Sequence, residues 1–267
     1  AMCNQIANIA PNLMSLIGEE LFYELLFQNN AYDVNAVERC IQSKCQKTLQ
    51  WVLSLKHVQM KYASDVDLKW RITFWLFVTP GISAETIDFV MKTLDISKET
   101  VIKFLSHECQ PPAGEVVQGY VQYHNNLLLT AIAGRNTVEA VQKMAGLIDE
   151  DVFVQHVFTV DHYGMNVIDA AIQSNKPETI KYLLSLKAVK ARFFDPDSPG
   201  LKRRAMVQLF LTEDTNIETI EFVMNTLLIS KESVTGLLPQ IAAQYTVQAV
   251  QKMASFIGDK ELFVQHV

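Results

Sequence analysis

The sequence lacks long hydrophobic runs and holds less positive than negative charge, and each shortage excludes a class of protein. No uninterrupted apolar stretch reaches the roughly 18 to 20 residues of a membrane-spanning helix, and the apolar residues 127–133 are expected to form a core helix. The chain carries 23 Lys and Arg against 29 Asp and Glu, a formal net charge of −6. Surfaces that bind nucleic acid concentrate Lys and Arg, and the compact basic run at residues 201–204 is short. We therefore expect neither a membrane span nor a nucleic-acid partner.

Cysteine is also scarce. The four cysteines, Cys3, Cys40, Cys45 and Cys109, lack the density of a disulfide scaffold. The first residues of the sequence do not show the charged and long apolar regions of a secretory signal. Cys40 and Cys45 are not followed by the second closely spaced pair that a structural zinc site needs. We expect inert thiols, no metal and a reducing, cytoplasmic compartment, or delivery into a host cell if the protein is an effector.

The motifs of enzyme active sites are missing as well. The sequence contains no glycine-rich phosphate loop, no G-x-S-x-G, no H-E-x-x-H and no D-x-D-x-D-G calcium loop. No known signature surrounds Cys109, so a nucleophilic cysteine is not indicated. We expect no catalytic residues, no cofactor and no enzymatic activity.

What the sequence does contain is a long internal duplication. Residues 32–56 match residues 163–187 at a shift of 131 positions (172 − 41), and residues 85–101 match residues 218–234 at a shift of 133 (218 − 85). A third pair, residues 137–148 and 246–257, is only 109 positions apart (246 − 137), and FVQHV ends both copies. Self-similarity at a nearly fixed period is typical of a repeat array.

A shorter repeat occurs inside each copy. Six segments begin with Thr and an aliphatic residue, and their apolar residues follow the i, i+3, i+4 spacing of one buried helical stripe, as in Ile180, Leu183 and Leu184. These six helices start at Thr48, Thr86, Thr137, Thr179, Thr219 and Thr246. Ser83 and Asn216 stand where helix N-caps belong, and Ser97 and Ser230 open further helix starts.

A second, shorter apolar segment precedes most of these helices, so the predicted unit is a helix pair. The short segments begin at Val34, Arg71, Asn126, Asn166 and Ala205. No strand-like alternation competes, and the predicted fold is all-α, a solenoid of stacked helix pairs. We expect an N-terminal capping helix region at 1–31, a first long copy at 32–157 with an extra segment at 105–136, and a shorter second copy at 158–267.

Residues 164–189 resemble an ankyrin repeat. Gly164, Ile168, Ala170 and Ala171 echo the G-x-T-P-L-H-x-A-A pattern, and Leu183 and Leu184 echo the leucines of the second helix. Asn166 and Val167 replace the Thr-Pro of the pattern, and Asp169 replaces its His. Consensus ankyrin units run about 33 residues, so the units of this chain are enlarged and irregular. The resemblance implies that the turns before the helices project as binding fingers.

The candidate partner-binding residues lie in two such places. The resemblance puts Asp161, His162 and Tyr163 in the turn before the ankyrin-like helix. Phe193 and Phe194 sit just before a Pro- and Gly-rich loop, where an exposed aromatic side chain would anchor a partner. The alternatives are ordinary turn chemistry for the first group and a hydrophobic contact between neighbouring units for the second.

Other aromatic and histidine side chains are expected to be structural. Trp70, Phe74, Trp75 and Phe77 form a dense apolar segment that should be core. His156 lies in the repeated FVQHV, which favours a structural role.

The sequence therefore predicts a non-enzymatic protein-protein interaction module or scaffold that binds another protein through its concave helix face and inter-repeat loops. One alternative is a substrate-recruiting arm of a larger enzyme or a host-directed effector. A second alternative is a helical-repeat nucleic-acid binder. Since the chain ends at FVQHV, where the first copy continues, we expect it to be a piece of a longer array.

Overall fold

The computed structural model describes residues 12–31, 34–105, 137–160, 164–244 and 247–258. Every regular element in these ranges is a helix, which confirms the all-α prediction. No helix among them is long and apolar enough to cross a bilayer. The chain divides into two compact units, Ala1–Asp149 and Glu150–Val267. The boundary between the units lies after Asp149, whereas the second repeat copy is expected to begin at residue 158. The limits of the repeat copies stay a prediction.

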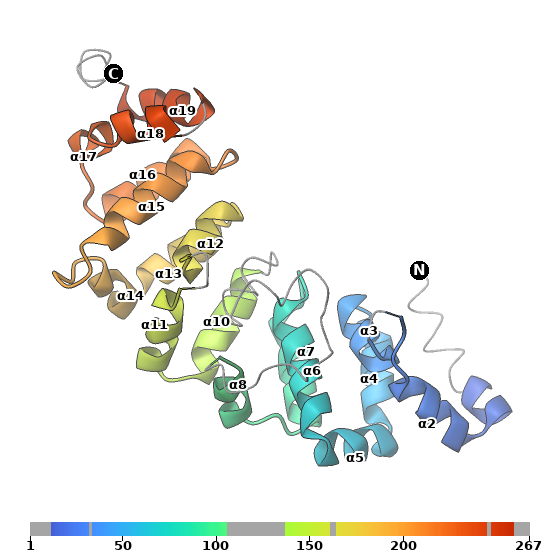
Figure 1. Ribbon diagram of the computed structural model, residues 1–267. Helices are drawn as coiled ribbons and strands as arrows, with labels where there is room; N and C mark the ends of the chain where they lie inside the picture. Colours follow the sequence, from blue (N-terminus) through green and yellow to red (C-terminus); the bar gives the residue numbers. More distant parts are fainter. Residues whose placement is uncertain (1–11, 32–33, 106–136, 161–163, 245–246, 259–267) are drawn as a thin grey trace. The chain divides into compact units, whose positions relative to one another are not determined.

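The first unit is a succession of short helices that pack on their neighbours along the chain. Its helices are α2 (Glu19–Phe27), α3 (Ala36–Gln42), α4 (Gln46–Ser54), α5 (Lys56–Ser64), α6 (Val66–Val78), α7 (Ala84–Thr93), α8 (Lys98–Leu105) and α10 (Val138–Leu147). The pair α3 and α4 packs on the pair α6 and α7, with α3 against α6 and α4 against α7, and α7 then packs on α10 (Figure 1). The helix expected at Asn126 and most of the segment 105–136 lie outside the described residues.

The second unit repeats this order. Its helices are α11 (Glu150–Phe158), α12 (Val167–Gln173), α13 (Pro177–Ser185), α14 (Lys187–Arg192), α15 (Gly200–Leu211), α16 (Ile217–Thr226), α17 (Lys231–Thr235), α18 (Leu238–Gln244) and α19 (Val247–Ile257). Here α12 packs on α15 and α13 on α16, as α3 packs on α6 and α4 on α7 in the first unit. The two units thus share one helix-packing scheme.

The equivalence starts one helix earlier than the sequence repeat indicated. Helix α2 begins at Glu19 and packs on α3, and α11 begins at Glu150, 131 positions later, and packs on α12. Helix α2, expected to be an N-terminal cap, therefore has the same place in its unit as α11 has in the second. The shift rises from 131 to 133 in the loop between α14 and α15, which is longer than the connection between α5 and α6.

The predicted helix faces and caps are confirmed. Ile180, Leu183 and Leu184 are at most 1% exposed, as the stripe on α13 requires. The side chains of Ser83 and Asn216 accept hydrogen bonds from the backbone N–H groups of Thr86 and Thr219, at 3.2 and 2.8 Å. Such caps satisfy a backbone donor that the first helical turn leaves without a partner.

The predicted helix pair is in fact followed by a third short helix, α5 or α14, that the sequence did not reveal. The break is made by Leu55 and Leu186, whose extended conformations (φ −72°, ψ 119° and φ −70°, ψ 122°) end one helix and begin the next at once. Neither residue is Gly or Pro, the residues that usually mark the end of a helix in a sequence.

In the aromatic segment of α6, Phe74 and Phe77 are buried as predicted, whereas Trp70 and Trp75 are half-buried.

Candidate functional site

A buried ion pair joins the two helix pairs of the first unit. Asn35 and Glu38 cap α3 reciprocally: the Asn35 side chain accepts from the Glu38 N–H at 3.0 Å, and the Glu38 carboxylate accepts from the Asn35 N–H at 3.2 Å. The guanidinium of Arg71, on α6, donates to both carboxylate oxygens of Glu38, from Nε at 2.7 Å and from Nη2 at 2.9 Å. The Glu38 side chain is fully buried. A two-point contact of this kind fixes orientation as well as distance.

The second unit repeats this arrangement at equivalent positions. Asn166 and Asp169 form the same reciprocal cap on α12, with hydrogen bonds of 2.9 and 3.0 Å. Arg204, in the first turns of α15 and 133 positions after Arg71, forms an ion pair with the buried Asp169. The residues that depart from the ankyrin pattern therefore supply a capping scheme of their own. Since Arg204 points inward to Asp169, it fixes the rotation of α15 about its axis.

An aromatic contact also recurs in both units. Phe27 and Tyr62 lie with ring centroids 5.9 Å apart in the first unit, and Phe158 and Phe193 lie 5.6 Å apart in the second. Phe158 and Phe193 each lie 131 positions after their equivalents in the first unit, Phe27 and Tyr62. Phe193 is only 4% exposed, so its ring packs inside the unit, which is the alternative that the sequence left open. It is not placed to anchor a partner.

Phe194, in contrast, lies on the surface at the corner where α14 ends and the loop to α15 begins. Its side chain is 41% exposed, and the ammonium of Lys202 sits 3.7 Å from its ring centroid. Lys190, one turn earlier on α14, and Arg203, next to Lys202 on α15, are also exposed. We call Lys190, Phe194, Lys202 and Arg203 the α14–α15 corner.

The loop of this corner is held by its own polar contacts. Arg192 donates to Asp195 at 3.0 Å, and the other carboxylate oxygen of Asp195 accepts from the Asp197 N–H at 3.0 Å. The guanidinium of Arg192 also lies 6.0 Å from the ring centroid of Phe158. The Arg192 contact therefore ties the start of this loop to α14, and the Asp197 contact holds the loop itself.

The equivalent corner of the first unit has different chemistry. Ala63 takes the position of Phe194 (194 − 131), and Trp70 takes that of Arg203 (203 − 133). Trp70 is half-buried and stacks on Phe74 at 5.7 Å. Lys69, the equivalent of Lys202, donates to the carbonyl oxygen of Asp95 at 3.4 Å instead of covering an aromatic ring. The exposed aromatic and its basic neighbours thus belong to the second unit alone, as far as the described residues go.

The remaining sequence candidates fall in two groups. Asp161, His162 and Tyr163 lie outside the described residues, so their partner-binding role stays a prediction. His156 is 8% exposed, in keeping with a structural role.

The two described cysteines differ in state. Cys45 is disulfide-bonded, so the expectation of unpaired, inert thiols is wrong at that residue. Cys40 is a free thiol, and burial raises its pKa to about 11. A thiol with so high a pKa is protonated at neutral pH and is not an activated nucleophile.

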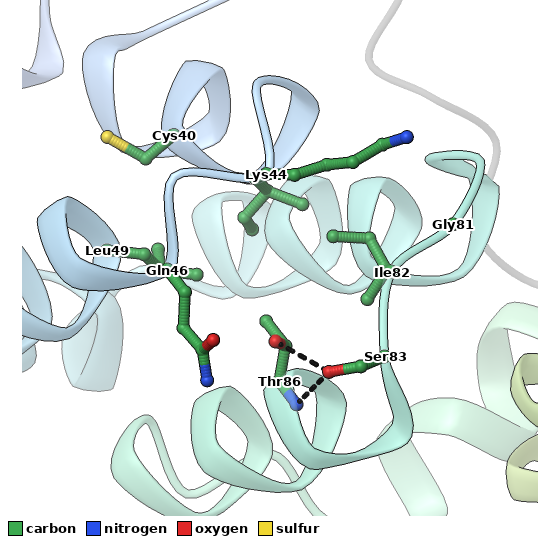
Figure 2. Close-up of a pocket in the computed structure, with 9 residues that line it drawn as sticks. Cys40, Lys44, Gln46, Leu49, Gly81, Ile82, Ser83 and Thr86 are labelled. Carbon is green, nitrogen blue, oxygen red and sulfur yellow. Dashed lines mark hydrogen bonds between the residues drawn. The ribbon is translucent and has the colours of Figure 1, made fainter. Parts of the chain in front are cut away.

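Cys40 borders a cavity of about 200 Å³ between the α3–α4 turn and the start of α7. Figure 2 shows Lys44 extending along this cavity toward Gly81. At the rim, the Ser83 hydroxyl accepts from the backbone N–H of Thr86 and shares a hydrogen bond with the Thr86 hydroxyl. The Ser83 hydroxyl is thus engaged in capping α7. The equivalents of Lys44 and Gly81 in the second unit are Asn175 and Asp214. The cavity offers space but no assembled catalytic group.

A second hollow, of about 320 Å³ and mostly apolar, lies between α2, α3 and α4 and is bordered by Leu13, Phe22, Leu25 and Trp51.

No group of three or more potential metal ligands occurs among the described residues. A comparison of the chain with protein-family models, with curated proteins and with solved structures finds no match.

Proposed function

We propose that this chain is a protein-protein interaction module, built as an ankyrin-like solenoid of helical repeats, and that the α14–α15 corner is its contact surface for another protein. The observation that carries the proposal is the exposed Phe194, with the ammonium of Lys202 3.7 Å from its ring centroid and the exposed Lys190 and Arg203 on the two helices that its loop connects. Aromatic side chains and arginine dominate the binding energy of protein interfaces, and charges around them steer association.

The difference between the two units supports this choice of surface. Positions that hold the helices together have the same roles in both units, including the capped ion pair and the inner aromatic pair. The α14–α15 corner has no such counterpart, since Ala63 and Trp70 occupy the equivalent positions in the first unit. A side chain that the repeat framework does not require is free to serve recognition. A non-enzymatic role is part of the same proposal.

The test is affinity capture from source-cell lysate with the full chain as bait, read by mass spectrometry. Phe194→Ser is compared with Val66→Ser, which removes another exposed apolar side chain (79% exposed) far along the sequence, in the first unit. We expect a protein that the parent chain and the Val66→Ser variant retain and that the Phe194→Ser variant loses, with all three baits equally helical by circular dichroism. A partner retained equally by all three baits would contradict the assignment of the surface.

A further inference from the structure

We infer that the α14–α15 corner recognises an acidic segment of a partner protein that also carries an apolar side chain. This inference rests on the proposed function, since it names the chemistry of the partner for the same surface. It follows from the charge around the corner and from the contact between Lys202 and Phe194.

The charge around the corner has the opposite sign to the chain. Residues 176–204 contain eight Lys or Arg and three Asp or Glu, a net charge of +5, whereas the whole chain carries −6. Within and beside this segment, Lys181 pairs with Glu178, Arg192 with Asp195, and Arg204 with Asp169. Lys190, Lys202 and Arg203 add positive charge at the surface itself. Complementary charge on a partner accelerates encounter and fixes orientation.

Phe194 adds an apolar requirement to the charge. The Lys202 ammonium lies on one side of the ring at 3.7 Å, and 41% of the side chain remains exposed. A cation over an aromatic face is held there by the ring quadrupole, so Lys202 stands beside the exposed part of the ring. A partner carboxylate that meets Lys202 would bring the neighbouring side chain of the partner onto Phe194. An apolar side chain would bury that part of the ring, whereas a purely acidic segment would not.

The charged side chains of the α14–α15 corner come from two neighbouring helices. Arg204 is turned into the unit by its ion pair with Asp169, and this contact leaves the preceding Lys202 and Arg203 on other faces of the first turns of α15. Lys190 lies in the last turn of α14, four residues before Phe194, which follows the end of this helix at Arg192. Lys202 therefore lies on the Phe194 ring, and Lys190 and Arg203 lie on the two helices that the Phe194 loop connects.

The test uses a fluorescein-labelled peptide of twelve Glu and three Leu residues and measures its fluorescence anisotropy with the full chain. A peptide with Gln in place of every Glu is the neutral control. The corner variant Lys190→Glu/Lys202→Glu/Arg203→Glu is matched by Lys47→Glu/Lys56→Glu/Lys92→Glu, which changes the net charge equally at three exposed lysines of the first unit. We expect the corner variant to weaken binding of the acidic peptide by at least about tenfold, and the matched variant by much less.

Two further expectations separate this inference from non-specific attraction. Phe194→Ser should weaken the Leu-containing peptide more than an all-Glu peptide, and binding should decrease with salt, as contacts between exposed charges do. Equal loss with both triple variants, or equal binding of the Gln peptide, would overturn the inference. So would corner-dependent binding of phosphatidylserine vesicles or single-stranded RNA that is tighter than binding of the peptide. If capture from lysate depends on Phe194 while the acidic peptide does not bind, the inferred chemistry fails and the proposed function stands.

Discussion

The two units hold their helices together in the same way, yet differ where α5 and α14 end. Glu38 with Arg71 and Asp169 with Arg204 are equivalent ion pairs, and Tyr62 and Phe193 are equivalent buried rings. At the next position the first unit has Ala63 and the second has the exposed Phe194. The comparison separates side chains that the fold needs from those that it does not.

The largest contrast should come from two adjacent residues. Phe193→Ala removes a ring that is 4% exposed and should lower the free energy of unfolding by about 3 to 5 kcal/mol, the usual loss for a buried aromatic. Phe194→Ala removes an exposed ring and should change it by no more than about 0.5 kcal/mol. Urea denaturation followed by circular dichroism measures both values. Similar losses at the two positions would show that the inner and outer rings have been assigned wrongly.

The ion pairs should differ between the units because their burial differs. Glu38→Ala leaves a guanidinium that is 8% exposed without its carboxylate, which should cost about 3 to 5 kcal/mol. Asp169→Ala should cost less, about 1 to 3 kcal/mol, because the Arg204 side chain is 31% exposed and reaches water.

Urea midpoints of the single variants rank these two costs. As a control, Arg71→Met in the Glu38→Ala background should recover much of the loss, since no charge then remains buried. A larger loss for Asp169→Ala than for Glu38→Ala would contradict the ranking.

Tyr62→Phe makes the first unit more like the second, and it should be neutral or stabilising by up to about 1 kcal/mol. The Tyr62 hydroxyl is buried near the Asn35 side chain but makes no hydrogen bond of ordinary geometry among the described residues. Burial also raises the pKa of Tyr62 well above its usual value of 10. The unfolded chain therefore loses this proton above about pH 10 while the folded chain keeps it, so alkaline pH favours unfolding.

The stability of the parent chain should accordingly fall more steeply above pH 10 than that of the Tyr62→Phe variant. Urea midpoints of both proteins at pH 8 and pH 10.5 provide the test, with the difference between the proteins as the readout. A parallel fall would show that Tyr62 is ionised in the folded chain.

The smallest predicted effect concerns two equivalent turns. Leu228 (φ 53°) and Asp95 (φ 50°) both adopt the left-handed conformation after a helix. Leu228 is 77% exposed, so Leu228→Gly loses little packing and should stabilise by about 0.5 to 1 kcal/mol. Asp95→Gly should gain less, since Asp tolerates this conformation better than Leu. Thermal denaturation compares the two variants, and a destabilised Leu228→Gly would refute the strain argument.

The sequence predicted much of the fold because helix periodicity and caps are local signals. The stripes on α13 and α16 and the caps at Ser83 and Asn216 needed only neighbouring residues. The ion pairs were missed because Glu38 and Arg71 lie on different helices, although each copy has an acid followed by an arginine at a similar spacing, 33 positions in the first (71 − 38) and 35 in the second (204 − 169). Which of Phe193 and Phe194 points inward depends on how α14 packs, and no local pattern encodes that.

The most direct test of the interaction surface is site-specific photocrosslinking. A photoreactive p-benzoylphenylalanine replaces Phe194 in one protein and its equivalent, Ala63, in another, and both full chains are irradiated in source-cell lysate. We predict a discrete crosslinked polypeptide from position 194 and none from position 63, and the acidic Glu/Leu peptide should compete with it. Crosslinks of equal yield from both positions, or none from position 194 in a lysate where the parent chain captures a partner, would contradict the account.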